Sequence, residues 1–215
     1  KSVDAALELL AHLDGSSPAA AVAGGWGAIE GLLAPPNDRS SAADNLAALV
    51  TCSFPRAELT RLAHLVQELN PGGYPTLEAA QTNRERSRIV GQMIMGRTMP
   101  VLRGLSDQAA VTRMEKLFCD PKTGLNIVRE VISDSFHRLY RQRNLILHGG
   151  KLDSVALTPS LRTVAKLAGA GMDRVTHGHY VQHVEPLDLV AKANFALATV
   201  DTANPLVCVE LLEMS

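Results

Sequence analysis

The chain has 215 residues, of which 46% are hydrophobic and 20% are charged, and its net charge is -1. This composition predicts a globular protein with a sizeable buried core, and the near-neutral charge argues against a protein that binds nucleic acid through its overall charge. Aromatic residues make up only 4% of the chain, so aromatic platforms for stacking single-stranded nucleic acid are scarce.

The helical pattern begins at the N-terminus. Alanine and leucine are abundant and β-branched alternation is rare, which predicts helices over residues 2–13, 19–33, 41–53 and 56–70. The stretches "DGSSP", "APPND" and "FP" separate them. The stretch "NPGGYP" at 70–75 is the strongest break, and we expect a boundary there between residues 1–70 and residues 71–215.

The second part of the chain has the same character. We expect helices over 77–95, 107–118, 161–172 and 187–201, together with a long helix that begins at Pro121. Asp120 before Pro121 is a good start signal, because aspartate caps a helix and proline is tolerated in its first turn. The fold class predicted for the whole chain is therefore an all-α, multi-helix bundle.

Cysteine spacing and apolar runs indicate the compartment. Cys52, Cys119 and Cys208 are far apart and form no C-x-x-C pair, which predicts free thiols in a reducing environment. No apolar run reaches the roughly 20 residues that a transmembrane helix needs, and we find no signal peptide. We therefore predict a cytoplasmic protein without a membrane partner.

The chain has no initiator methionine and starts within a helical pattern, so we expect it to be part of a longer protein.

The long helix contains a charge where its pattern calls for an apolar residue. At about 100° per residue, Arg143 falls inside the apolar stripe of this helix. An unpaired charge in a protein core costs several kcal/mol or more, so two interpretations remain. Either Arg143 has a dedicated partner, or this end of the stripe faces something other than a dry core. The stripe consists of Leu125, Val128, Ile132, Phe136, Leu139 and Ile146.

A second row of polar residues flanks this stripe. Tyr140, Asn144 and His148 follow one another at four-residue spacing, so they lie on neighbouring turns of one helix face. Gly149 and Gly150 supply a stop signal that places His148 at the C-terminus of the helix. There the helix dipole favours a positively charged imidazole.

Arginine, asparagine and histidine together suit phosphodiester chemistry. Arg143 can hold the nonbridging oxygens and stabilise developing negative charge, and His148 can accept or donate a proton. Asn144 can orient the imidazole or the phosphate. This chemistry needs no metal or other cofactor. Positive charge on the neighbouring surface, which an RNA substrate requires, comes from Arg138, Arg141 and Lys151.

The segment "RNLILH", within "YRQRNLILHGG" at 140–150, resembles the R-x4-6-H signature of HEPN domains, in which asparagine often follows the arginine. The wider string resembles the HEPN modules of bacterial antiviral and toxin systems. Arg143, Asn144 and His148 match the motif residue by residue, and Tyr140 is a weaker match. The resemblance lies in the motif and covers roughly residues 120–150, and the helices expected from about 77 to 205 are consistent with the fold of the family. We therefore expect residues 71–215 to form a HEPN-like bundle, preceded by a helical region of unknown role over residues 1–70.

The resemblance implies a metal-independent endoribonuclease. Domains of this family generally form homodimers in which arginine and histidine of two protomers face one composite cleft. Cleavage leaves a 2',3'-cyclic phosphate and a 5'-hydroxyl. Such an activity harms the host, so the resemblance also implies a regulatory sensor domain, an antitoxin or another partner.

Another interpretation of the motif stays open. Arg143 and His148 could be a structural pair, with the arginine bonded to a carboxylate or carbonyls and the histidine at a helix end. The chain would then be a catalytically silent helical module. Such a module would use the same helix for dimerisation or for binding an antitoxin or a nucleotidyltransferase.

The stretch "HGHYVQH" is a second histidine cluster. His177, His179 and His183 have a spacing that could place zinc ligands, but only Glu185 offers a fourth group. We favour a polar, solvated loop between helices. A third possibility is that one of these histidines lines the RNA cleft.

Two further stretches have simple interpretations. The arginines of "TNRERSR" (82–88) could extend an RNA-binding surface, although a solvated helix face is the simpler interpretation. The glycines of "AGGWG" (23–27) follow no strand and lack a Lys-Ser/Thr pair, so they are not a phosphate loop. We expect close helix packing there, with Trp26 as a core anchor.

Overall fold

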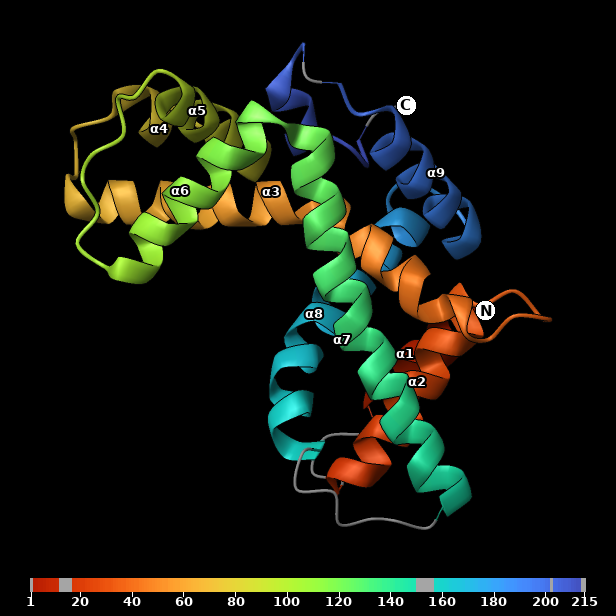
Figure 1. Ribbon diagram of the computed structural model, residues 1–215. Helices are drawn as coiled ribbons and strands as arrows, with labels where there is room; N and C mark the ends of the chain where they lie inside the picture. Colours follow the sequence, from red (N-terminus) through yellow and green to blue (C-terminus); the bar gives the residue numbers. More distant parts are fainter. Residues whose placement is uncertain (1, 12–16, 150–156, 202, 214–215) are drawn as a thin grey trace. The chain divides into compact units, whose positions relative to one another are not determined.

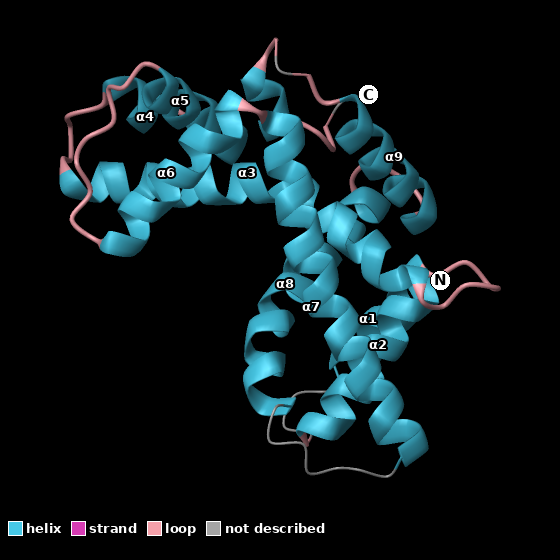
Figure 2. Cartoon of the chain, in the orientation of Figure 1, coloured by secondary structure: helices cyan, strands magenta, loops and turns pink. Residues whose placement is uncertain are grey.

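The computed structural model describes residues 2–11, 17–149, 157–201 and 203–213. In these ranges the chain forms nine α-helices and one 3-10 helix, and no strand is present (Figure 2). The predicted all-α class is confirmed. In chain order the elements are α1 (Ser2–Ala11), α2 (Pro18–Leu33), α3 (Ser41–Leu69), α4 (Pro75–Ala79), α5 (Asn83–Met95), α6 (Leu105–Cys119), α7 (Pro121–Gly149), α8 (Leu157–Tyr180), α9 (Pro186–Thr199) and η1 (Pro205–Val209).

The two helices predicted over 41–53 and 56–70 form a single helix, α3, with Pro55 in its interior. A proline inside a helix removes one hydrogen bond and costs about 3 kcal/mol. Leu49 and Leu59, on the two sides of Pro55, are both fully buried. Burial of the apolar residues on both sides offsets that cost, so the prediction of a break at "FP" was wrong.

The helix predicted over 77–95 is divided in two. α4 ends at Ala79 and α5 begins at Asn83, because Thr82 starts a new helix. The Thr82 hydroxyl accepts from the Glu85 amide at 3.1 Å, and the Glu85 carboxylate accepts from the Thr82 amide at 3.0 Å. This reciprocal capping box satisfies two donors at the start of α5.

The predicted loop "HGHYVQH" is helical over its first half. α8 continues to Tyr180, so His177 and His179 lie in its last turn. The chain leaves the helix through His183, whose φ of 55° is in the left-handed region. The amide of Val184 donates to the carbonyl of Gly178 at 2.9 Å and closes this end of the helix.

The described chain divides into two compact units that are interleaved along the sequence. Unit 1 combines residues 1–50 with 128–194, and unit 2 combines residues 51–127 with 195–215. The division predicted at residues 70–75 falls inside unit 2, and it stays a prediction.

The core of unit 1 is built around Trp26 of α2, whose exposed fraction is 1%. Its ring lies 6.5 Å from Phe136 and 5.8 Å from Tyr140, both on α7, measured between ring centroids. Figure 1 shows α1 and α2, in red, next to the C-terminal half of α7. The prediction that Trp26 anchors the core is confirmed, and this packing positions the end of α7 that carries the HEPN-like motif.

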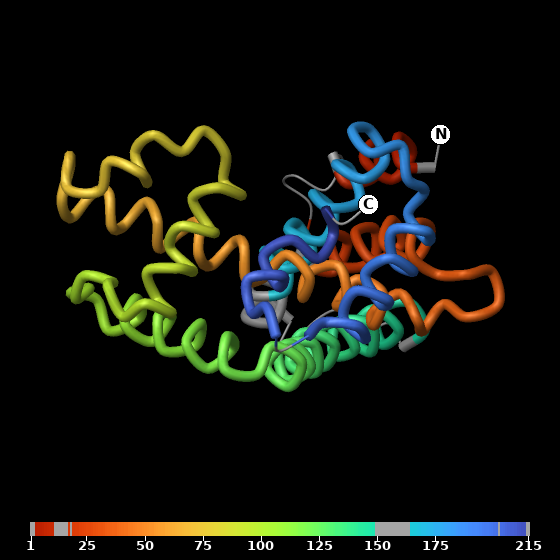
Figure 3. The backbone as a smooth tube through the Cα atoms, turned by 90° about the horizontal axis from the view of Figure 1, so that it is seen from above, coloured from red at the N-terminus to blue at the C-terminus, as the bar shows by residue number. Residues whose placement is uncertain are grey.

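Unit 2 contains α4, α5, α6 and η1, and Figure 3 traces the first three of these from yellow to green. Its core includes Leu77 and Met114, both fully buried. Two arginines of the "TNRERSR" stretch are held by one carboxylate: Arg84 and Arg88 contact Glu210 at 2.7 and 3.2 Å. These contacts account for Arg84 and Arg88 without a nucleic-acid ligand.

The Glu210 cluster predicts a loss of stability in acid. The hydrogen bond from Arg84, with smaller charge effects from Arg88 and Arg56, holds the pKa of Glu210 below its ordinary value. A lowered folded-state pKa stabilises the fold above the unfolded-state pKa, and this contribution disappears as the pH falls through the folded value. We expect Glu210→Gln to lower the free energy of unfolding by about 1 kcal/mol at pH 7 and by much less at pH 3. Urea unfolding followed by circular dichroism at both pH values measures the difference. An equal effect at the two pH values contradicts the ion-pair explanation.

Candidate active site

The C-terminal part of α7 carries the motif, and its arginine is held by a carboxylate of the same chain. The Nη2 atom of Arg143 donates to Oε2 of Glu30 on α2 at 3.2 Å. The exposed fractions of the two side chains are 15% and 8%, so the pair is largely shielded from solvent. An ion pair shielded in this way is costly to break from one side, because the remaining charge is left without a partner.

Glu30 and Arg143 belong to a longer set of hydrogen bonds. The indole Nε1 of Trp26 donates to the other carboxylate oxygen of Glu30 at 2.9 Å. Arg143 donates through Nη1 to Oδ1 of Asn144 at 2.8 Å. We call Trp26, Glu30, Arg143 and Asn144 the Glu30 network. In this network the guanidinium of Arg143 is held by Glu30 and by Asn144, and the Asn144 side-chain oxygen accepts its hydrogen bond from Arg143.

The first of the two interpretations of the charge in the apolar stripe is therefore correct: Arg143 has a dedicated partner. A guanidinium has more N–H donors than the two that these bonds use. Its Nε is buried and has no hydrogen-bond partner among the described residues. The guanidinium of Arg143 is thus held in place by two hydrogen bonds, and its other N–H groups take no part in these two bonds.

His148 is in a different environment. It lies in the last turn of α7 and is exposed to solvent. Five residues along a helix correspond to a rotation of about 140°, so Arg143 and His148 of one chain point in divergent directions. Tyr140 is half-buried and packs on Trp26. Arg143 contacts Glu30, Asn144 contacts Arg143, and Tyr140 packs against Trp26. His148 lies outside the Glu30 network.

The predicted basic surface is present in part. Arg138 and Arg141 are exposed on α7, and neither has an ion-pair partner within the described ranges. Lys151 and Gly150 lie outside the described residues. Gly149 is the last described residue of α7, so the predicted stop at Gly149 and Gly150 stays a prediction.

Sequence reasoning missed Glu30, although a signal was present. Glu30 is the one charged residue of α2, in the segment "PAAAVAGGWGAIEGLL". A lone acid in an apolar helix and a lone arginine in an apolar stripe are natural partners, since each charge needs the other when buried. Their separation of 113 residues hides the pairing.

The second histidine cluster does not form a ligand set. His179 approaches Glu185 at 3.8 Å, while His183 is exposed in the turn that follows α8. Within the described residues, no three side chains of histidine, cysteine, aspartate or glutamate are grouped so that they could hold a metal ion. The zinc interpretation therefore has no geometric support in this part of the chain.

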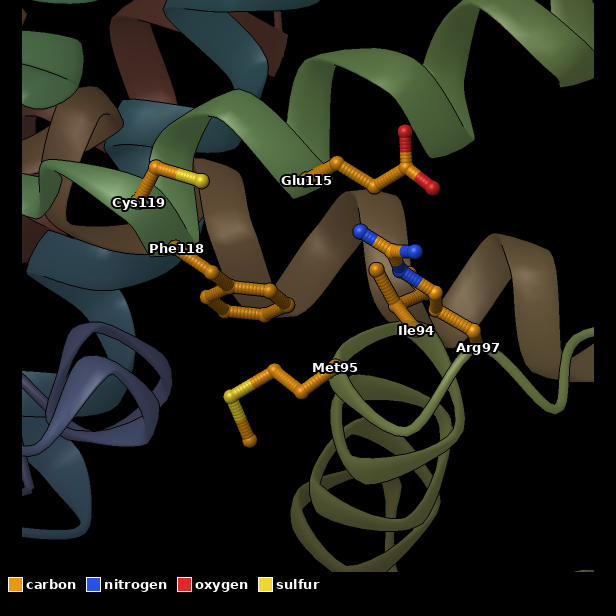
Figure 4. Close-up of a pocket in the computed structure, with 6 residues that line it drawn as sticks. All are labelled: Ile94, Met95, Arg97, Glu115, Phe118 and Cys119. Atoms are coloured by element: carbon orange, nitrogen blue, oxygen red, sulfur yellow. The ribbon is translucent and has the colours of Figure 1, made fainter.

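Two cavities lie near charged side chains, one in each unit. Glu30 and Arg39 line a pocket of about 500 Å³ in unit 1, at the end of α2. In unit 2, α5 and α6 enclose a pocket of about 590 Å³ with Arg97 and Glu115 at its edge and Phe118 in its wall (Figure 4). Arg97 has a φ of 55°, which is unusual for a residue other than glycine. No residue of the unit 2 pocket belongs to the HEPN-like motif.

We found no match of the chain to a family model, to a curated protein or to a solved structure. The functional interpretation therefore rests on the residues and their geometry. None of the helices in the described part of the chain combines the length and the apolar character that crossing a bilayer requires.

Proposed function

We propose that the protein is a metal-independent endoribonuclease of HEPN type that acts through Arg143, Asn144 and His148. One observation carries the proposal: a single helix end combines a guanidinium fixed by Glu30 and Asn144 with a solvent-exposed histidine at its terminus. A fixed cation and an accessible imidazole are the groups that RNA transesterification needs.

In the proposed reaction the 2'-hydroxyl of the RNA attacks the adjacent phosphorus. His148 accepts the proton of that hydroxyl or donates one to the 5'-oxygen that leaves. Arg143 binds the nonbridging oxygens, on which negative charge increases in the transition state. Asn144 keeps the guanidinium oriented. The products are a 2',3'-cyclic phosphate and a 5'-hydroxyl, so no water is consumed in this step.

The proposed site is completed by a second copy of the chain. Arg143 and His148 of one helix diverge by about 140°, so one phosphate meets both groups more readily when they come from two protomers. Val131, Leu145 and Leu147 of α7 are apolar and exposed, with exposed fractions of 64%, 58% and 51%. Exposed apolar side chains along this helix support a protein contact there.

The proposed substrate is cellular or invading RNA in the cytoplasm, and Arg138 and Arg141 offer positive charge beside the site. An unregulated ribonuclease damages its own host. We therefore place the protein in an antiviral or toxin–antitoxin system, where a sensor domain, an antitoxin or another partner controls it.

Incubating the protein with structured RNA in EDTA tests the proposal. We expect cleavage products that end in a cyclic phosphate, with a rate lowered about 100-fold or more by His148→Ala and by Arg143→Ala. Arg143→Lys keeps a positive charge beside Glu30 and serves as a second variant if Arg143→Ala does not fold. It is expected to lose at least about 10-fold, because a lysine cannot bind phosphate with two N–H groups.

Two matched controls separate the motif from general effects of substitution. His64→Ala removes an exposed helical histidine of α3, and Arg129→Ala removes a half-buried arginine of α7 that donates to Asn194 at 2.7 Å. Both variants are expected to cleave at the parental rate. Equal cleavage by all variants indicates a contaminating nuclease and rejects the proposal.

A second candidate function is favoured by one observation. Arg143 is already bonded to Glu30 within its own chain, as a purely structural arginine would be. The protein would then be a silent helical module that uses α7 for dimerisation or for an antitoxin or nucleotidyltransferase partner. Absence of cleavage, together with a dimer that Leu145→Asp dissociates, supports this function over the first.

A further inference from the structure

Unit 1 contains an apolar cavity of about 320 Å³. It lies between α1, α2, α7 and α8, where the HEPN-like motif plays no part. Its larger lining side chains are Leu10, Val22, Trp26, Ile29, Leu139 and Met172. The other described residues that line it are alanines and glycines. Among the described residues that line it, none is charged and none carries a hydroxyl group.

Small residues give this cavity its opening. Ala165 and Gly169 on α8 both line it and both are exposed to solvent. A Cβ atom added at Gly169 meets no other atom within 4 Å. Among the described lining residues, the exposed ones are thus on α8, where we expect the cavity to open. Its opposite wall includes the core residues Trp26 and Leu139, with exposed fractions of 1% and 5%.

The lining determines what kind of molecule the cavity can bind. A polar group placed inside finds no free side-chain hydrogen-bond partner among the described lining residues and loses its hydration, which costs free energy. An apolar cavity of about 150 Å³ admits benzene, so a cavity of about twice that volume admits a longer apolar group. We propose that unit 1 binds a medium-length aliphatic chain in this cavity, with the polar end of the molecule beside Ala165 and Gly169.

The bound chain would lie against the indole ring of Trp26. The same indole donates through Nε1 to Glu30, which holds Arg143. The cavity and the Glu30 network thus share one side chain. Binding of the aliphatic chain does not require the ribonuclease proposal, and either can fail without the other.

Trp26 is the single tryptophan of the chain, so its fluorescence reports on the cavity directly. The probe is 10-bromodecanoate, whose bromine quenches indole fluorescence only at contact distance. We expect saturable quenching of Trp26 in the full chain, and we expect decanoate without bromine to reverse it by competition. Quenching that does not saturate, or that decanoate does not reverse, overturns the proposal.

Two substitutions at Gly169 form a matched pair. Gly169→Leu places a branched side chain beside the cavity. Gly169→Ala also removes the helical glycine, but its single methyl group leaves most of the cavity volume empty. We expect Gly169→Ala to bind the probe within about twofold of the parent, and Gly169→Leu to bind at least about tenfold more weakly. Equal quenching in the two variants overturns the proposal.

A fold control accompanies each variant. Removal of a glycine from a helix interior favours the helix by about 0.5–1 kcal/mol, so both variants are expected to fold. Far-ultraviolet circular dichroism and the Trp26 emission maximum without probe verify this. If the Gly169→Leu protein has the parental spectra and still shows parental quenching, the probe binds elsewhere and the proposed site is rejected.

Discussion

Replacing Glu30 with alanine is expected to lower the free energy of unfolding by about 3 kcal/mol. The substitution leaves the guanidinium of Arg143 without its carboxylate and the buried indole N–H of Trp26 without its acceptor. A loss of this size is large because small proteins are stable by only about 5–15 kcal/mol. Urea unfolding followed by far-ultraviolet circular dichroism measures it, since Trp26 fluorescence itself changes with the substitution.

A double-mutant cycle isolates the contribution of the ion pair. We expect the Glu30→Leu/Arg143→Leu protein to be more stable than the sum of the two single losses predicts, with a coupling of about 2 kcal/mol. Asp107→Ala is the control, because it breaks the more exposed pair with Arg61, at 2.6 Å. That loss is expected to stay below about 1 kcal/mol. Additive losses for Glu30 and Arg143 contradict the assigned role of the pair.

Mixing two inactive variants is expected to restore RNA cleavage. If one site takes its arginine from one protomer and its histidine from the other, a dimer of Arg143→Ala with His148→Ala contains one intact site. Random exchange of subunits at equal concentrations then yields about a quarter of the parental activity. The measurement is the cleavage rate in EDTA after the two proteins have been incubated together.

The controls for this experiment exploit the same variants. Arg143→Ala and His148→Ala, each incubated alone, have to remain inactive. Arg143→Lys, which keeps some activity of its own, should likewise gain activity when it is mixed with His148→Ala. A mixture as inactive as its components means that both groups act within one chain.

Helix positions in this chain are predictable to a large extent because capping and stop signals are local. Asp120 starts α7 as expected, with its carboxylate accepting from the Thr123 amide at 3.1 Å. One error arose where distant packing overrode a local signal, and another where a local signal was missed. Pro55 does not end α3, since buried residues on both sides keep the helix together. Thr82 was overlooked because its capping box depends on a single residue three positions later.

The candidate site was predictable only in its local part. Arg143, Asn144 and His148 belong to one helix, so the sequence alone places them near one another. Glu30 is contributed by α2, and nothing in the spacing of α7 indicates which distant acid pairs with Arg143. The orientation of Asn144 toward Arg143 likewise depends on where Glu30 fixes the guanidinium. Tertiary packing, and not helix periodicity, decides these contacts.

The interleaving of the two units has a consequence for biosynthesis. Unit 1 begins with residues 1–50 but needs residues 128–194, and residues 51–127 of unit 2 are made in between. Glu30 emerges 113 residues before Arg143, which corresponds to a delay on the order of ten seconds at about 5–20 residues per second. During that time α2, with Trp26, has no α7 to cover it. We therefore expect the nascent chain to expose an apolar helix with one solvated carboxylate, the kind of surface that chaperones at the ribosome protect from aggregation.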